Sequence, residues 1–308
     1  MDNIKIGLIG LGVIGTPIAH KLYNYYNDDF FLIANGERRK WLERHNMRIN
    51  NELFAPKIIS KKEELEKPLS LLIVCIKNYD IEKSIQDFKE ITDDTTIILP
   101  LQNGIFSYDF FCNHFFNNTV LRGYVQGPNT KKYGSNIIYS NPGIMHIGKT
   151  QKDKQDIAHN IFDMLDNAGI NVVWENNIKK MVWKKWMLNV AGNSVTALTL
   201  ADYSCFKKNE EIQILCKSAM HEFLMVAQHE NVNLTKSDID DVIEYYVNYN
   251  GKKKTSMLED ILNNRPTENE FLAGELIRMA EKHGISTPII KTMYQLIKIR
   301  ENQYMTGE

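Results

Sequence analysis

The chain has 308 residues, enough for two domains, and 43% of them are hydrophobic while 24% are charged, as in globular proteins. Its 37 basic and 38 acidic side chains give a net charge of −1, which argues against nucleic acid or a membrane surface as partner. No segment reaches the run of about 20 apolar residues that spans a bilayer. The four cysteines form no C-x-x-C pair, so we expect reduced, mostly buried thiols in a cytoplasmic protein.

The first predicted element is a short apolar strand, Ile4–Ile9, which leads into Gly10-x-Gly12-x-x-Gly15 and then a helical pattern. Strand, glycine turn and helix in this order form a dinucleotide-binding motif. Gly10 permits the tight turn, Gly12 lets the backbone approach a pyrophosphate, and Gly15 lets the helix pack close to the strand. Free N–H groups at the start of the helix then face the phosphates. The alternative is a glycine-rich turn that binds nothing.

The first half of the chain alternates strand-like and helix-like segments. Helical patterns at Glu37–His45 and Ile81–Phe88 separate apolar runs, which is typical of a parallel, doubly wound sheet. The predicted strands are Lys5–Gly10, Phe30–Ala34, Leu71–Lys77, Thr96–Leu101 and Val120–Val125.

Two further strand-like runs, Asn136–Ser140 and Ile144–Gly148, flank the turn signal Asn141-Pro142-Gly143. They predict an antiparallel hairpin appended to the sheet. Residues 154–168 are expected to form a helix, and Asn171–Trp174 a last strand.

Beyond about residue 177, strand patterns give way to long helices with breaks near Gly251, Arg265-Pro266 and Gly284. We therefore predict an α/β chain with an N-terminal Rossmann-type dinucleotide-binding domain over 1–176. An all-helical substrate or catalytic domain is expected over 177–308.

The choice of nicotinamide cofactor depends on the end of the second predicted strand. NAD-binding folds carry an acid there that binds the ribose 2′-hydroxyl, whereas this chain has Asn35. Arg38 and Arg39 follow, and an arginine can bind a 2′-phosphate through two hydrogen bonds. We expect NADPH rather than NADH, with Asn35 and Arg38 as contacts. Two alternatives stay open: the arginines are ordinary surface charges, or Glu37 holds the ribose.

Three polar side chains, Lys185, Asn189 and Asn193, recur at every fourth position of a predicted helix of high apolar content, Lys179–Leu198. At 3.6 residues per turn they share one face, and burying them without partners is costly. A ligand with oxygen atoms would supply those partners, and a lysine suits a reaction in which hydride transfer places negative charge on a ketone oxygen. The alternatives are a stripe that faces solvent or makes helix-packing hydrogen bonds.

With these motifs the chain resembles the ketopantoate reductase (2-dehydropantoate 2-reductase) family over nearly its whole length. The glycine turn resembles the family's cofactor loop. Lys77 ends a strand where the family has a cofactor-contacting lysine. Gln102-Asn103-Gly104 resembles a motif whose asparagine, here Asn103, lies near nicotinamide and substrate. Asn35 departs from the arginine that the family often has there.

The helical half carries the more specific part of the resemblance. Trp183-Lys184-Lys185 and the two asparagines resemble the family's catalytic helix, which implies Lys185 as general acid and Asn189 and Asn193 as substrate contacts. Thr255-Ser256-Met257 resembles a motif whose second hydroxyl, here Ser256, holds the substrate carboxylate. Thr267-Glu268 matches a further motif and implies Glu268 as a substrate-binding acid.

The resemblance implies NADPH-dependent reduction of 2-dehydropantoate to pantoate, a step of pantothenate synthesis, with the substrate held between the two domains. A reductase of another small 2-keto acid and a non-catalytic NADP-binding sensor remain as alternatives. No histidine arrangement suggests a metal ion, and His146 reads as structural. The sequence leaves the oligomeric state open, a homodimer included.

Overall fold

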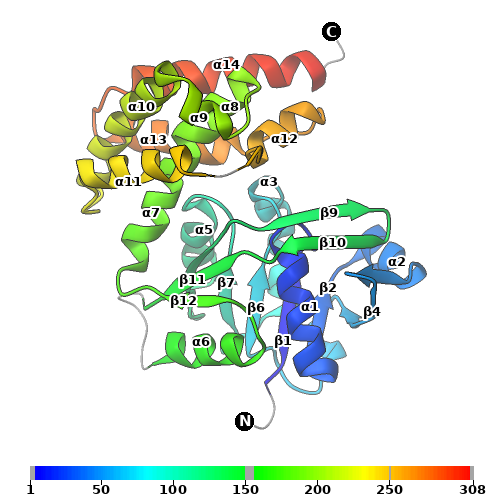
Figure 1. Cartoon of the computed structure of the whole chain (residues 1–308). Helices are drawn as coiled ribbons and strands as arrows, with labels where there is room; N and C mark the ends of the chain where they lie inside the picture. The colour runs from blue at the N-terminus through cyan, green and yellow to red at the C-terminus, as the bar shows by residue number, and fades with distance from the viewer. Residues whose placement is uncertain (1–3, 150–155, 250, 306–308) are drawn as a thin grey trace. The chain divides into compact units, whose positions relative to one another are not determined.

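The computed structural model describes residues 4–149, 156–249 and 251–305 (Figure 1). The chain forms two compact units, residues 1–178 and residues 179–308. Among the described residues, none of the helices has the length and apolar content that a membrane crossing requires. Within the same ranges, no group of three or more histidine, cysteine or acidic side chains could hold a metal ion.

The first unit is built around a five-stranded parallel sheet. Its strands, in spatial order, are β5 (Lys57–Ile59), β2 (Phe30–Ile33), β1 (Ile6–Ile9), β6 (Leu71–Val74) and β7 (Ile97–Pro100). The strands are almost wholly apolar because the sheet is buried on both faces. Since β1 pairs with β2 on one side and β6 on the other, the winding reverses beside β1, where sheets of this kind bind ligands.

Helices cover both faces of this sheet and create two apolar cores. On one face, α1 (Gly15–Tyr26) packs with Leu32. On the other, α4 (Ile85–Ile91) and α5 (Phe106–His114) pack with Phe31. Neighbouring strand residues enter opposite cores, as the two-residue period of a strand requires. This arrangement confirms the predicted doubly wound fold.

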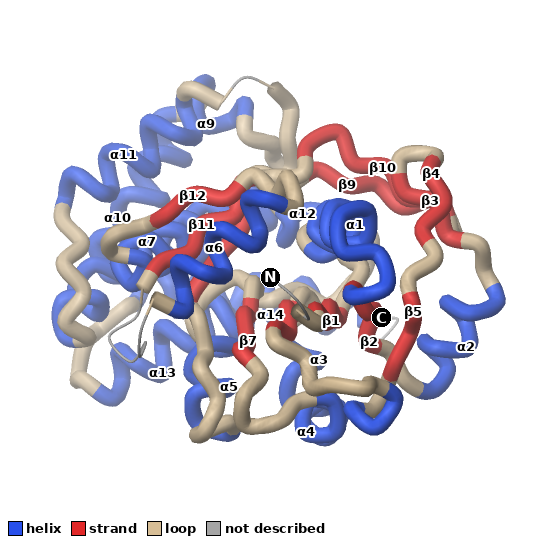
Figure 2. The backbone as a smooth tube through the Cα atoms, turned by 90° about the horizontal axis from the view of Figure 1, so that it is seen from below, coloured by secondary structure: helices blue, strands red, loops and turns tan. Residues whose placement is uncertain are grey.

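Two smaller sheets complete the first unit, and Figure 2 shows the strands of one of them as a group apart from the row β7, β1, β2, β5. That group has the order β4-β3-β10-β9, and the other sheet has the order β12-β11-β8. The helix α6 (Ile157–Asn167) packs on β11 and β12; residues 154 and 155 of the predicted helix lie outside the described residues. The strands are β3 (Met47–Ile49), β4 (Glu52–Phe54), β8 (Arg122–Gln126), β9 (Asn129–Tyr133), β10 (Asn136–Asn141), β11 (Ile144–Gly148) and β12 (Val172–Trp174).

The predicted hairpin between β10 and β11 is wrong. β10 pairs antiparallel with β9, across a turn at Gly134, whereas β11 pairs with β8 and β12. The Asn141-Pro142-Gly143 signal does mark a turn, since the Asn141 side chain accepts a hydrogen bond from the Gly143 N–H at 2.9 Å and Gly143 has φ +83°. The chain uses this turn to leave one sheet and enter the other, because a turn signal fixes a change of direction and not the strands that pair.

The second unit is helical, and its described residues contain no strand. Its core is aromatic, with Trp186 packed edge-on against Phe223 and Tyr246 stacked on Phe206. The predicted breaks near Gly251, at Arg265-Pro266 and at Gly284 all fall between helices. The helices are α7 (Ile178–Leu188), α8 (Ser194–Thr199), α9 (Ser204–Lys208), α10 (Glu210–His229), α11 (Lys236–Val247), α12 (Ser256–Leu262), α13 (Glu275–Lys282) and α14 (Pro288–Met305).

Two short π-helical turns interrupt the helices of the second unit. The first, η4 (Asn189–Asn193), joins α7 to α8, and the second, η5 (Glu270–Gly274), leads into α13. The two turns pack against each other. A π turn widens the helix by one residue, and such turns are frequent at functional sites.

Candidate active site

The turn between β1 and α1 requires glycine at two positions. Gly10 has φ +102°, and a Cβ there would lie 2.6 Å from the carbonyl carbon of Cys75. A Cβ on Gly15 would lie 1.9 Å from the backbone oxygen of Gly10, so only glycine lets α1 begin this close to β1. At Gly12, apart from the residue itself and its two chain neighbours, no atom of the described residues comes within 4 Å of where a Cβ would stand. The backbone at Gly12 is therefore open to a pyrophosphate, as the motif predicts.

A cavity of about 330 Å³ lies at the carboxyl ends of β1 and β2. Both Asn35 and Arg38 line it, as does Gly10, which brings three of the predicted cofactor residues to one place. Its size and its position at the switch point of the sheet suit the adenosine half of a dinucleotide. The polar side chains that line it are Asn35, Arg38, Ser60, Asp80, Lys83, Ser84 and Asp87.

Asp87 also lines this cavity, although the sequence did not indicate it as a site residue. The Asn35 amide donates a hydrogen bond of 2.6 Å to its carboxylate, across 52 residues of sequence. Burial raises the pKa of Asp87, the nearby Glu90 adds to this, and the Asn35 hydrogen bond opposes it. Asp87 lies on α4 with no sequence signal of its own, so only the fold could reveal that it faces Asn35.

The other charged residues that follow β2 have different roles. Glu37 is exposed and pairs with Lys40 at 2.7 Å, and it does not line the cavity. Arg39 makes ion pairs with Glu43 and Glu64 at 2.8 and 2.9 Å, so it ties α2 (Gly36–Arg44) to the neighbouring loop. Of the two arginines weighed as phosphate ligands, only Arg38 faces the cavity.

The loops that follow β6 and β7 are tied together at the same edge of the sheet. The Asn78 amide donates to the backbone oxygen of Asn103 at 3.0 Å, and the Gln102 amide donates to the backbone oxygen of Ile76 at 3.0 Å. Lys77 stands at the start of α3 (Asn78–Ile81). Because parallel strands end at a common edge, Lys77 and Asn103 lie on the side of the sheet where the glycine turn lies.

In the second unit, the three-residue polar stripe lies partly on a π turn. Lys185 is on α7, whereas Asn189 and Asn193 begin and end η4, so the predicted continuous α-helix is wrong at this point. The widened turn still brings the two amides together, and Asn193 Nδ2 donates to Asn189 Oδ1 at 3.3 Å. Both side chains are buried, and Asn189 Nδ2 has no acceptor among the described residues. A buried donor in this state is suited to an oxygen atom of a ligand.

The electrostatics around Lys185 suit a group that exchanges protons near neutral pH. Burial lowers the pKa of Lys185 to about 8, the carboxylate of Glu268 opposes this, and the ammonium of Lys253 adds to it. Glu268 is itself 5% exposed. A lysine with a pKa near the working pH is an effective proton donor. The structure therefore brings Lys185 and Glu268 into one electrostatic neighbourhood.

The two hydroxyls at the start of α12 have separate roles. Thr255 is buried, caps α12 by accepting a hydrogen bond from the Leu258 N–H at 3.2 Å, and contacts the hydroxyl of Thr196 at 2.8 Å. Ser256 is exposed at the first position of the helix. Thr255 thus caps the helix, and the Ser256 hydroxyl takes no part in the cap.

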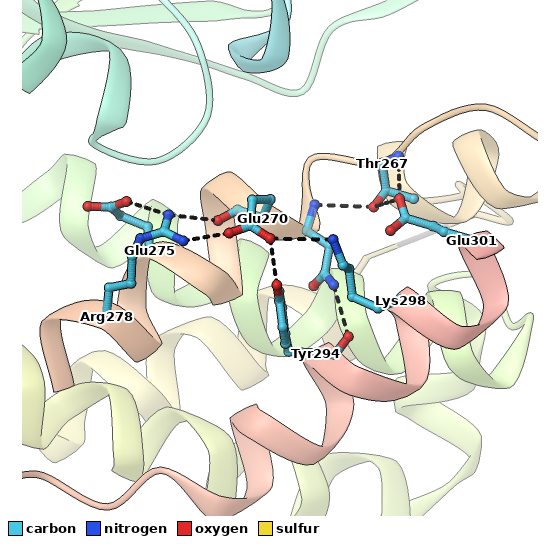
Figure 3. A network of polar contacts seen from close by, with 8 residues as sticks. Thr267, Glu270, Glu275, Arg278, Tyr294, Lys298 and Glu301 are labelled. Atoms are coloured by element: carbon cyan, nitrogen blue, oxygen red, sulfur yellow. Dashed lines mark hydrogen bonds and ion pairs between the residues drawn. The ribbon is translucent and has the colours of Figure 1, made fainter. Parts of the chain in front are cut away.

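Side chains of α13 and α14 anchor the segment that carries Glu268 (Figure 3). The N–H and hydroxyl of Thr267 both donate to Glu301, at 2.7 and 2.6 Å. On the other side, the Asn269 amide donates to the backbone oxygen of Tyr294 at 3.0 Å. Glu270, which begins η5, accepts hydrogen bonds from Tyr294 and Arg278. Residues on both sides of Glu268 are thus fixed, which restricts where its carboxylate can lie.

A parallel sheet with a glycine turn at its switch point, joined to a helical unit with a low-pKa lysine, defines a class of dinucleotide-dependent oxidoreductases. Family models place the chain within that class. Residues 6–152 match "Ketopantoate reductase PanE/ApbA", and residues 177–301 match "Ketopantoate reductase PanE/ApbA C terminal". The chain belongs to the ketopantoate reductase family, and it is an oxidoreductase of the kind that acts on 2-keto acids.

Curated relatives agree with this assignment. The chain is 24% identical over 312 residues to a 2-dehydropantoate 2-reductase of Lactococcus lactis, a match that covers 97% of this chain and 98% of the relative. It is also 24% identical to a 2-dehydropantoate 2-reductase of Shigella flexneri, over 83% of this chain and 82% of the relative.

Solved structures share the fold over nearly the whole chain. A dimeric ketopantoate reductase from Staphylococcus aureus superposes with a TM-score of 0.81 at 23% identity, covering 98% of this chain and all of the other. D-mandelate dehydrogenase, solved with NADH and anilino(oxo)acetate, superposes with a TM-score of 0.86 at 22% identity and the same coverage. The fold thus occurs with more than one 2-keto or 2-hydroxy acid.

Proposed function

We propose that the protein reduces the C2 ketone of 2-dehydropantoate to a hydroxyl, giving pantoate for pantothenate synthesis, with NADPH as the hydride donor. Membership of the family and the curated relatives support the reaction. The observation that carries the proposal is Lys185, a half-buried residue whose pKa is lowered to about 8 by desolvation and whose ammonium interacts with the carboxylate of Glu268.

In the proposed mechanism, Lys185 donates a hydrogen bond to the ketone oxygen and then transfers a proton to it. The glycine turn, Asn35 and Arg38 would hold NADPH, which would supply the hydride for C2, so that the ketone would be reduced and the cofactor oxidised. Glu268 stabilises the ammonium form of Lys185 before the transfer. Negative charge develops on the ketone oxygen only during the reaction. The hydrogen bond from Lys185 to this oxygen therefore lowers the barrier more than it strengthens substrate binding.

We further propose that the amides of η4 and the start of α12 hold the rest of the substrate. Asn189 Nδ2, a buried donor that lacks an acceptor among the described residues, would donate to a substrate oxygen. Asn193 orients Asn189 through their mutual hydrogen bond. The exposed hydroxyl of Ser256 would bind the substrate carboxylate, as the family motif implies. On the cofactor side, Lys77 and Asn103 would contact the nicotinamide half.

The direct test is Lys185→Ala assayed with NADPH and 2-dehydropantoate. Loss of the proton donor should lower kcat by roughly 10²–10⁴ while NADPH binds as before. Lys184→Ala is the matched control, because Lys184 pairs with the buried Asp238 and the exposed Asp241 and should be dispensable for turnover. Full turnover by Lys185→Ala would refute the mechanism.

The proposed preference for NADPH is supported by Arg38, which faces the cavity, and by the absence of an acid at position 35. NADH is the alternative, and D-mandelate dehydrogenase, which shares the fold, was solved with NADH. Comparing kcat/KM for the two cofactors decides between them, and a higher value with NADH would reverse the proposal.

Two other functions remain distinct from this proposal. A reductase for another small 2-keto acid would consume NADPH faster with a different member of a keto-acid panel than with 2-dehydropantoate. A non-catalytic sensor would bind NADPH without oxidising it in the presence of any keto acid. The presence of both Lys185 and Glu268 favours an enzyme over a sensor.

For location and assembly, we propose a cytoplasmic homodimer. None of the four cysteines, all of which lie in the described ranges, forms a disulfide, although only Cys216 is fully buried. Ile214 and Met225 on α10 and Ile299 on α14 are exposed apolar side chains that a partner could cover. Light scattering on the purified chain measures the assembly, and a monomeric mass would exclude the dimer.

A further inference from the structure

Beside the predicted adenosine cavity, a lysine from a distant strand lies close to Arg38. Arg38 stands 5.0 Å from the centre of the Trp41 ring, and Lys132, on β9, stands 5.4 Å from the centre of the same ring. The pKa of Lys132 is lowered by burial and by the charge of Arg38. Two cations are thus held on one indole at the edge of a cavity that Arg38 lines.

The register of β9 and β10 explains why Lys132 faces this place. Lys132 is paired with Ile137, which is buried in the core that Trp41 packs against. Its neighbour Lys131 is paired with Ile138, which is 41% exposed. Since paired residues of a sheet project to the same face and neighbours to opposite faces, Lys132 is on the inner face and Lys131 on the outer face.

The charges around the cavity are not balanced on this side. Of the two carboxylates that line the cavity, Asp80 pairs with Lys83 at 3.9 Å, and Asp87 keeps its charge and accepts a hydrogen bond of 2.6 Å from the neutral amide of Asn35. Within the described parts of the chain, neither Arg38 nor Lys132 makes an ion pair with a carboxylate. Like charges held together without a counter-charge repel each other, and an anion between them would relieve that repulsion.

We propose that Lys132 and Arg38 together form the binding site for the 2′-phosphate of NADPH, so that Lys132 is a specificity-determining residue for the cofactor. A second cation here would compensate for Asn35, which carries no charge with which to attract a phosphate. Ionised donors make the stronger hydrogen bonds to phosphate oxygens. The proposal rests on the proposed use of NADPH and assigns a residue of β9 to the discrimination between NADPH and NADH.

Direct binding measurements on Lys132→Ala test this assignment without any turnover. The dissociation constants of NADPH and NADH are measured by titration calorimetry for the wild-type chain, Lys132→Ala and Lys131→Ala. We expect Lys132→Ala to raise the dissociation constant of NADPH about five- to tenfold and to leave that of NADH unchanged. Lys131→Ala, which alters the charge by the same amount on the opposite face of the strand, should leave both constants unchanged.

Two smaller probes separate the phosphate from the rest of the cofactor. Adenosine 2′,5′-bisphosphate should lose affinity for Lys132→Ala, whereas adenosine 5′-monophosphate should not. The assignment would be overturned if Lys132→Ala lowered the affinity for both probes equally. It would also be overturned if the Lys131 and Lys132 variants lowered the affinity for NADPH equally. A wild-type chain that binds NADPH no more tightly than NADH would overturn it as well. Failure to reduce 2-dehydropantoate would refute the proposed reaction but leave these binding results intact.

Discussion

At the scale of single residues, the protonation state of Lys185 governs the proposed chemistry. Its pKa of about 8 lies below the usual lysine value, chiefly because burial disfavours the ammonium. A general acid must be protonated when the hydride arrives, so turnover should fall as the pH rises through this value. Lys253, in the loop before α12, contributes to the lowered pKa. It comes from the run 252–254, for which a solvated loop is the simplest interpretation of the sequence.

Lys253→Met tests this electrostatic coupling. Removing the neighbouring cation should raise the pKa of Lys185, so the basic limb of the pH profile of kcat should move to higher pH. The measurement is kcat between about pH 6 and 10 with saturating cofactor, a range that brackets a tuned catalytic lysine.

Lys254→Met is the matched control for this profile. Lys254 is exposed and is not among the groups that shift the pKa of Lys185, so its removal should leave the limb in place. The coupling is contradicted if both variants shift the profile equally, since that would indicate a general effect of net charge.

The sequence predicted site residues where their positions along the chain are related by a helical repeat or a known motif. Lys185, Asn189 and Asn193 could be proposed as a group because they recur within one helical segment. Asp87 and Lys132 could not be found, because each faces its partner only after strands or helices far apart in sequence have come together. Their positions follow from tertiary packing, about which a single sequence gives no direct information.

At the scale of elements, the two π turns of the second unit are each fixed by an aromatic hydrogen-bond donor. The Tyr246 hydroxyl donates to the backbone oxygen of Leu188, just before η4, at 3.0 Å. The Trp186 ring N–H donates to the backbone oxygen of Leu272 in η5 at 3.2 Å. Gly192 makes room for the first donor, since a Cβ there would lie 2.0 Å from the Tyr246 hydroxyl oxygen.

Tyr246→Phe should therefore act on the substrate amides through η4. Loss of the buried hydrogen bond should destabilise the chain by about 1 kcal/mol. It should also loosen Asn189 and Asn193, so KM for the keto acid should rise severalfold while the dissociation constant of NADPH stays unchanged. Steady-state kinetics, calorimetric titration with NADPH and thermal unfolding measure the three quantities.

The control for Tyr246→Phe is Tyr203→Phe, which removes a hydroxyl from a ring packed edge-on against Tyr246. A double variant gives the sharper test, because Tyr246→Phe should no longer raise KM in an Asn189→Ala background if it acts through that amide. Additive effects on KM would show that Tyr246 acts independently of Asn189, and an unchanged KM in Tyr246→Phe would show that Tyr246 contributes to stability alone.

Elements were predicted well where the sequence pattern is local. Apolar strands such as Leu71–Val74 and the glycine turn at Gly10 follow from period and backbone geometry. The hairpin between β10 and β11 failed because strand pairing is decided by distant partners, here β9 and β8. The π turn η4 could not be predicted, because the sequence does not show where a helix accommodates an extra residue. Only the backbone hydrogen bonds of the structure show it.

At the scale of the whole molecule, the two units contain different parts of the proposed machinery. The glycine turn, the cavity beside β2 and the cation pair Arg38 and Lys132 belong to the first unit. Lys185, the η4 amides and Glu268 belong to the second unit. The proposed division of labour assigns the cofactor to the first set of residues and the keto acid to the second.

Hydrogen exchange detected by mass spectrometry tests this division on the intact chain. A ligand that binds the native state slows the opening of the segments it contacts. NADPH alone should therefore give its largest protection in residues 9–15, 35–44 and 76–87. Addition of pantoate to the NADP⁺ complex should extend strong protection to residues 185–193 and 255–268. The helix α6, which carries none of the proposed contacts, is the internal reference. If pantoate protected segments of the first unit alone, the substrate would not contact the proposed residues of the second unit. The roles proposed for Lys185 and Glu268 would then both be refuted.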